Sequence, residues 1–158
     1  MSRINGKKEV IEKIERWLQE EAYTSEKSDK PYDDFRTVIH PPRPNQNIGM
    51  DLFLERDKTD RITIATNSKL SEQDQKTFSY LKPSIKQKLV RELKYSLLPL
   101  NIQFTFEPDE LIIESIMLSK RLYFDGLNKN MFFDAIFTII RALAIINLKY
   151  QELASKKV

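Results

Sequence analysis

Apolar positions recur along the chain in two rhythms, one typical of helices and one typical of strands. In residues 8–22 they recur at intervals of three and four, which predicts an amphipathic helix. Its apolar face consists of Val10, Ile11, Ile14, Trp17 and Leu18. The next stretch, residues 24–34 (TSEKSDKPYDD), is polar and contains Pro31, so we expect a linker or loop there.

Three segments with strand character follow at short intervals: residues 35–40 (FRTVIH), 47–56 (NIGMDLFLER) and 61–66 (RITIAT). The first is rich in β-branched and aromatic residues, and the second alternates between two faces. The inward face is expected to carry Ile48, Met50, Leu52, Leu54, Ile62 and Ile64. Consecutive strands with short links predict an antiparallel meander. Phe53 falls on the opposite face, so it is expected to point away from this core.

The second half of the chain predicts helices around a further pair of strands. Ser71 is a candidate N-cap with Asp74 three residues later, and Pro83 is expected to divide the following helix into two pieces. The second piece, residues 84–98, is expected to pack through Ile85, Leu89, Val90, Leu93 and Leu97. Strands are predicted over residues 101–107 and 111–124, joined by a turn at 108–110. Asn128 is a candidate cap for the last helix.

The resulting fold class is α+β with an antiparallel sheet and the order α-β-β-β-α-β-β-α. We expect a single domain over residues 1–158, with an ordered core of about 8–150.

The last helical run, residues 131–148, has fourteen apolar residues among eighteen, which approaches the length of a membrane span. Asp134 and Arg141 interrupt it, and each charge would cost about 2.5–3.5 kcal/mol at a bilayer centre. We therefore interpret it as a buried helix of a soluble protein, with no membrane partner. Its polar stripe of Asp134, Thr138 and Arg141 is narrow, so it needs cover from the sheet together with the first helix or a second subunit.

Composition narrows the classes of function. Hydrophobic residues make up 41% and charged residues 31% of the chain, which indicates a globular protein. The net charge of +3 and the pI of about 9.0 permit a polyanionic partner without requiring one. The chain has no cysteine, which excludes disulfides, thiolate nucleophiles and cysteine zinc sites. No apolar signal segment begins the chain, so a cytoplasmic location is expected.

The stretch HPPRPNQN, residues 40–47, holds the chain's single histidine. A catalytic His40 would need an acid, base or nucleophile as partner, and the sequence has no nucleophile-elbow motif. The run Pro41-Pro42-Arg43-Pro44 fits a PxxP docking peptide, yet a stiff exposed connection between two strands is the favoured interpretation. If this loop has a function, contact with a partner is favoured over catalysis.

Signatures of cofactor and metal sites are absent from the sequence. The three glycines are far apart, which excludes a phosphate-cradling loop, and the acidic pairs fall in predicted turns without calcium-loop spacing. We therefore predict no cofactor, no metal and no enzymatic activity.

Basic residues mark the helix around residues 82–94, which carries Lys82, Lys86, Lys88, Arg91 and Lys94. Such a stripe can bind phosphates, but Glu92 lies within it and no aromatic residues are interleaved, so a solvated face is favoured. Phe53, accompanied by Ala65, Ile112, Ile116 and Leu118, indicates instead a semi-apolar second sheet face. Such a face calls for a covering helix or a partner, and self-association is the commonest case.

The order of elements resembles the fold of type III secretion chaperones. The chain also resembles an uncharacterised archaeal family of unknown function with the same layout, over roughly residues 8–150. The similar stretches are ERWLQEEAY (15–23), FRTVIHPP (35–42), KLVRELKYSLL (88–98) and LYFDGLNKN (122–130). The resemblance implies a homodimer that binds a protein, with an extended or partly unfolded segment as its client, and it transfers no catalytic residue.

The sequence thus favours a non-enzymatic, cytoplasmic, homodimeric interaction or chaperone-like module with a protein or peptide partner. The candidate interaction residues are Phe53, His40, Arg43, Lys86, Arg91 and Lys94. A nucleic-acid-associated basic protein is the alternative, and an enzyme with a Ser, Asp or Lys centre assembled across the fold is the third interpretation.

Overall fold

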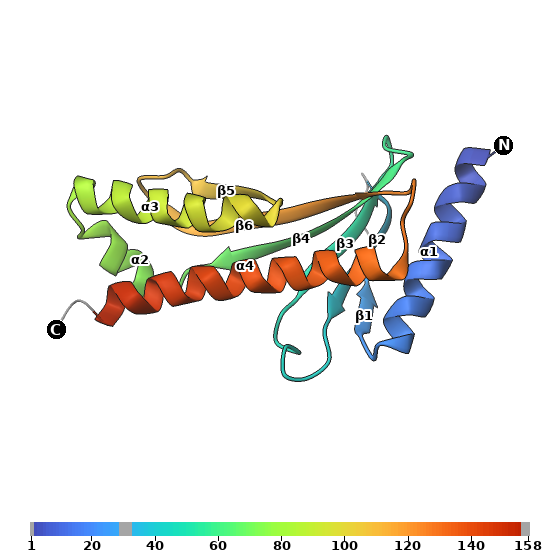
Figure 1. The fold of residues 1–158 in the computed structure, drawn as a ribbon, viewed down its shortest axis with the longest axis horizontal. Coiled ribbons are helices and arrows are strands. Elements are labelled where there is room, and N and C mark those ends of the chain that lie inside the picture. The colour runs from blue at the N-terminus through green and yellow to red at the C-terminus, as the bar shows by residue number, and fades with distance from the viewer. Residues whose placement is uncertain (1, 29–32, 156–158) are drawn as a thin grey trace. The chain divides into compact units, whose positions relative to one another are not determined.

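The computed structural model describes residues 2–28 and 33–155 (Figure 1). Its elements are α1 (Ser2–Glu20), β1 (Thr24–Lys27), β2 (Asp33–His40), β3 (Met50–Glu55), β4 (Arg61–Lys69), α2 (Glu72–Ser79), α3 (Pro83–Leu97), the 3₁₀ turn η1 (Leu98–Leu100), β5 (Gln103–Pro108), β6 (Ile113–Tyr123) and α4 (Lys129–Ser155). The strands form a six-stranded antiparallel sheet in the order β1-β2-β3-β4-β6-β5. The predicted α+β class is confirmed.

The chain forms two compact units. The first comprises residues 1–66 and 121–135, and the second comprises residues 67–120 and 136–158. Strands β4 and β6 and helix α4 contribute residues to both units. The expectation of a single domain stays a prediction.

The prediction of a linker or loop at residues 24–34 is wrong for the part of this segment that the structure describes. Residues 24–27 form β1, which pairs antiparallel with β2 from Thr24 opposite His40 to Lys27 opposite Thr37, and β2 already begins at Asp33. Residues 29–32, with Pro31, lie outside the described residues. All four β1 side chains are exposed. An edge strand that pairs through its backbone with both faces exposed has no apolar alternation, so its polar sequence gives no strand signal.

The first unit contains the predicted meander. Strands β2, β3 and β4 pair antiparallel, and Leu52 lies between Thr37 and Ile64. The inward residues are buried as expected, except Ile48, which is half-buried: Met50, Leu52, Leu54, Ile62 and Ile64. Ile14 and Leu18 of α1 are buried too, as the helical spacing predicts.

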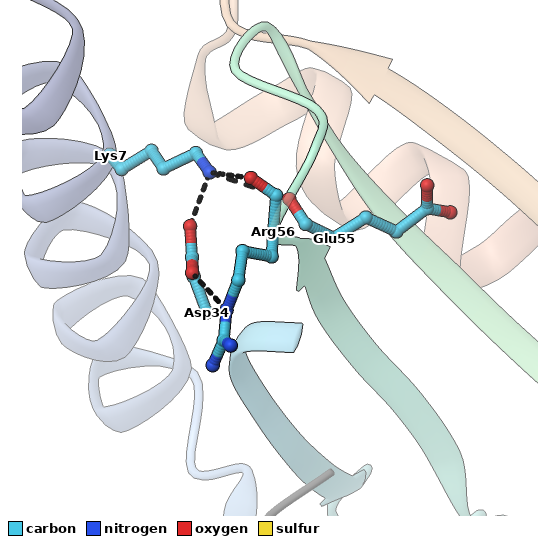
Figure 2. Close-up of polar contacts among 4 residues, drawn as sticks. All are labelled: Lys7, Asp34, Glu55 and Arg56. Carbon is cyan, nitrogen blue, oxygen red and sulfur yellow. Dashed lines mark hydrogen bonds and ion pairs between the residues drawn. The ribbon is translucent and has the colours of Figure 1, made fainter. Parts of the chain in front are cut away.

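Helix α1 is attached to the strands of this unit by a polar cluster (Figure 2). The Lys7 ammonium donates to the Asp34 carboxylate and to the backbone carbonyls of Glu55 and Arg56, the latter two at 3.4 Å each. Arg56 Nε donates to Asp34 Oδ1 at 3.4 Å. Hydrogen bonding to Lys7, and next to it the Arg56 guanidinium, lowers the pKa of Asp34 below its usual value.

The C-terminal end of α1 also meets the first turns of α4. The ring centroids of Trp17 and Phe132 are 5.9 Å apart, and those of Tyr23 and Phe133 are 5.3 Å apart. Phe132 and Phe133 are buried. The expected cover of the last helix by the first is therefore found at this end.

Charges at this junction compensate one another. Lys129, the first residue of α4, contacts Glu20 and Glu21 at 2.7 and 2.8 Å. Acidic residues at a helix C-terminus and a lysine at a helix N-terminus each oppose the helix dipole. Their pairing offsets both unfavourable placements.

The second unit is built around α2, α3, the hairpin β5–β6 and residues 136–155 of α4. The Ser71 side chain caps α2 by accepting from the Asp74 N–H at 3.1 Å, and α3 begins at Pro83, so both helix-start predictions are confirmed. The core contains Phe78, Leu89, Val90, Leu93, Leu97, Phe106, Ile113, Ile116, Leu118, Ala142 and Ile146.

Several side chains in this unit lie elsewhere than the sequence predicts. Ile85, expected in the apolar face of α3, is exposed. Ile116 and Leu118, expected on a second sheet face beside Phe53, are buried in the core, since they pair with Phe106 and Phe104 in the β5–β6 ladder. Thr138, expected in the polar stripe of α4, is buried.

Helix α4 is long and apolar enough to cross a membrane by length and composition. In this unit Ile136, Ile139, Ala142 and Ile146 form its buried side. Its exposed side carries Phe137, Arg141, Ala144 and Leu148, which recur at helical spacing. We call these four residues the α4 stripe.

Candidate interaction surfaces

The six candidate residues fall into two groups. His40, Arg43 and Phe53 belong to the first unit, whereas Lys86, Arg91 and Lys94 all project from α3 in the second.

His40 packs against Gly49 at the end of the β2–β3 pair. A Cβ placed on Gly49 would lie 3.3 Å from His40 Cε1, so the ring occupies the space that a side chain at position 49 would need. The histidine is half-buried. This packing supports a structural role for His40, and it favours glycine at the position just before β3.

The loop that carries Arg43 folds back on itself. The Asn45 N–H donates to the Pro42 carbonyl at 3.1 Å, and Arg43 Nε donates to Gln46 Oε1 at 3.2 Å. Pro42, Arg43 and Pro44 are exposed. A hydrogen-bonded turn differs from the extended polyproline II helix that a PxxP groove binds. The geometry therefore favours the connecting role over the docking peptide.

Phe53 lies on the face opposite Leu52, as predicted, but a cation covers it. The Arg36 guanidinium carbon lies 4.7 Å from the Phe53 ring centroid. Arg36 also pairs with Asp33 at 2.8 Å and with Asp51 at 3.4 Å. The aromatic face is thus satisfied within the sheet by a cation–π contact.

The cations of α3 have mixed engagement. The Lys86 ammonium lies 5.4 Å from the centroid of the buried Phe78 ring, and Lys94 pairs with Glu110. Arg91 is exposed and has no acidic partner among the described residues. Lys82 and Lys88 are exposed as well, so the predicted solvated face is found at three of the five cations, while Lys86 and Lys94 make internal contacts.

Two hollows flank Leu111, at the tip of the β5–β6 hairpin. The first, of about 250 Å³, is lined by Gln87, Val90, Arg91, Lys94, Glu110 and Leu111. The second, of about 260 Å³, is lined by Gln75, Lys76, Phe78, Ser79, Lys86, Leu111, Ile112, Ile113 and Glu114. The three α3 candidates Lys86, Arg91 and Lys94 all line one or the other. We call the lining of both hollows the hairpin surface.

The tip residues of this surface are apolar and exposed. Leu111 and Ile112 are 59% and 60% exposed, although the sequence predicts them as the first residues of a strand. Asp109 Oδ1 accepts from the Leu111 N–H at 2.7 Å and from the Ile112 N–H at 2.8 Å, so both residues lie in a turn and β6 begins only at Ile113. The sequence feature that could have predicted this turn is the PDE segment, since an Asp side chain accepts hydrogen bonds from the backbone N–H groups two and three residues further on.

A third hollow of about 250 Å³ is lined by residues of α3 and α4. It is lined by Ile85, Lys88, Leu89, Glu92, Lys149, Glu152 and Leu153. Lys149 pairs with Glu92 across it at 3.3 Å. Among the described residues, no group of three or more His, Asp or Glu side chains is placed to hold a metal ion.

These features define an α+β protein with an antiparallel sheet and apolar, cation-bearing surfaces. A solved structure shares the fold: an uncharacterised protein from Methanothermobacter thermautotrophicus, with a TM-score of 0.82 and 23% sequence identity, covering 89% of this chain and 96% of that chain. Residues 10–150 match the family described as "Uncharacterized conserved protein (DUF2299)". The chain belongs to this family, whose function is unknown. No curated protein matches the chain.

Proposed function

We propose that this protein is a non-enzymatic protein-interaction module that acts as a homodimer. The α4 stripe carries this proposal. Phe137 is 49% exposed and Leu148 is 63% exposed, with Ala144 between them on the same face of a core helix. Burying such a surface is worth about 25 cal/mol per Å² of apolar area, which favours cover by another chain.

A second copy is the occupant that the stripe fits best. The stripe is a ridge along one helix. In an isologous dimer the same ridge of each copy packs against the other copy, so one such surface is sufficient. Arg141 lies at its centre and is exposed. A charge at the centre of a bilayer is costly, whereas arginine is enriched in protein–protein interfaces.

Internal contacts of several polar and charged side chains support the non-enzymatic part of the proposal. His40 packs on Gly49, Arg36 covers Phe53, and Lys94 pairs with Glu110. A chaperone-like activity is the finer form of the proposal. It rests on the resemblance of the element order to secretion chaperones, from which the chain departs by the additional strand β1.

The test is the oligomeric state in solution. Size exclusion with light scattering over a hundredfold range of concentration should give twice the chain mass of 18.7 kDa. The double substitution Phe137→Glu and Leu148→Glu should give a folded monomer, while Asn147→Glu, exposed on the same helix beside the stripe, should remain a dimer. A wild-type monomer at every concentration would refute the proposal.

A further inference from the structure

We infer that the hairpin surface binds a short acidic segment of a partner protein that also carries apolar side chains. The inference deepens the proposed interaction role by naming the chemistry of the partner. It uses residues on α2, α3 and the β5–β6 hairpin, all within the second unit and separate from the α4 stripe.

The apolar part of this surface is already in a fixed conformation. Leu111 and Ile112 project from a turn that the Asp109 carboxylate holds by two short hydrogen bonds. A partner that buries these side chains therefore has little loop entropy to remove. Preorganisation of this kind increases affinity without additional contacts.

The shape of the surface suits side chains rather than a metabolite. Leu111 lines both hollows, so it forms a ridge between them. Each hollow, at about 250 and 260 Å³, is smaller than the roughly 300–1,000 Å³ of small-molecule sites. Two neighbouring shallow hollows with an apolar ridge match a chain segment that places one side chain on each side of Leu111.

The charge of the surface selects an acidic segment. Lys76, Lys86, Arg91 and Lys94 line the hollows, against Glu110 and Glu114. Lys94 and Glu110 pair with each other, whereas Lys76 and Arg91 have no acidic partner among the described residues. The exposed Arg91 guanidinium can bind a carboxylate through two parallel hydrogen bonds.

The same cations would also attract nucleic acid, but the aromatic ring of this surface is not placed to stack on a base. Single-stranded nucleic acids bind where bases stack on exposed aromatic rings. The aromatic ring of this surface, Phe78, is 1% exposed and lies under Lys86. The exposed apolar groups are the aliphatic Leu111 and Ile112, which offer no stacking face. A protein segment is therefore the favoured partner.

Fluorescence anisotropy with the full chain tests the inference. The probe is a labelled peptide of alternating acidic and leucine residues; one comparison peptide has lysine in place of the acids, and another has serine in place of the leucines. We expect the acidic leucine peptide to bind at least about tenfold more tightly than either comparison. The Leu111→Ser and Ile112→Ser double variant should lose about tenfold in affinity with an unchanged thermal midpoint, since both residues are exposed.

Charge reversal supplies the matched pair of variants. Arg91→Glu should weaken binding of the acidic peptide about tenfold, whereas Lys88→Glu, exposed on the same helix but lining the third hollow, should leave it unchanged. Equal losses from both variants, or no preference for the acidic leucine peptide, would overturn the inference. Tighter binding of a labelled single-stranded oligonucleotide, lost with Arg91→Glu, would overturn it in favour of nucleic acid. A monomeric chain that still binds the peptide refutes only the proposed dimer, and a dimer that does not bind it refutes only this inference.

Discussion

Tyr150 provides a sharp test of how the second unit is held together. Its side chain is 4% exposed and lies in the core with Leu70, Phe78 and Ile146. The phenol oxygen is buried and has no hydrogen-bond partner among the described residues. In the unfolded chain this hydroxyl is hydrogen-bonded to water, so folding loses that interaction without replacing it.

Tyr150→Phe should therefore stabilise the protein. An unsatisfied buried polar group costs about 1–3 kcal/mol, and removing one partnerless hydroxyl recovers that cost. The void left by a single oxygen offsets about 0.5 kcal/mol of the gain. We expect a net increase of about 0.5–2.5 kcal/mol in the free energy of unfolding, measured by urea denaturation near pH 7 with an unchanged m value.

The pH dependence gives an independent readout. Burial raises the pKa of the Tyr150 phenol above the usual 10.0, and the negative charge of Asp74 raises it further. The unfolded chain therefore loses this proton first. The stability contribution of the neutral phenol is complete below about pH 10 and is lost as the pH rises toward the folded pKa, at about 1.4 kcal/mol per pH unit.

Tyr150→Phe removes this loss, so the two stability curves should diverge above about pH 10. Burial also raises the pKa of Tyr23, but that residue is present in both proteins and cancels from the difference. Tyr95→Phe, at an exposed position on α3, is the control and should change neither stability nor its pH dependence. A destabilised Tyr150→Phe would show that the hydroxyl has a stabilising partner. Curves that stay parallel at alkaline pH would show that folding does not raise the pKa of this phenol.

Three further substitutions test local features of the fold. Ala22, two residues after the end of α1, has a φ of 60°, and the Tyr23 N–H donates to the Leu18 carbonyl at 2.9 Å. Ala22→Gly should therefore raise the free energy of unfolding by about 1 kcal/mol, and a lower thermal midpoint would contradict this. Ser71→Ala removes the α2 cap and should cost about 1 kcal/mol in urea denaturation, while an unchanged midpoint would deny the cap its role. The lowered pKa of Asp34 contributes stability that is present above its usual value of 3.8 and is lost as the pH falls. Asp34→Asn should therefore cost under about 1 kcal/mol near neutral pH and make the thermal midpoint less sensitive to acid. Equal acid sensitivity in the two proteins would contradict this.

The candidate surfaces were only partly predictable from the sequence. Lys86, Arg91 and Lys94 stand out because they cluster on one predicted helix, and the structure brings all three to the hairpin surface. Their apolar neighbours Leu111 and Ile112 did not stand out, since alternation assigns them to a strand. The Asp109 turn, a competition between side-chain and backbone hydrogen bonding, delays the strand by two residues and exposes both.

The sequence by itself determined the features that depend on neighbours within a few residues. These are the period of α1, the alternation in β3, the cap at Ser71, the break at Pro83 and the cap at Asn128, whose side chain accepts from the Met131 N–H at 2.9 Å. Such features follow from backbone sterics and local hydrogen bonds, which act at fixed sequence spacing.

Only the tertiary structure decided which apolar faces find cover and which charges find partners. It pairs Lys129 with Glu20, places Arg36 over Phe53, buries Thr138 and leaves Phe137 and Leu148 exposed. It also makes a strand of the polar residues 24–27 through pairing with β2. These outcomes depend on contacts between segments that are distant in sequence. Burial and strand pairing release free energy only when such segments come into contact, and a local sequence pattern does not specify those contacts.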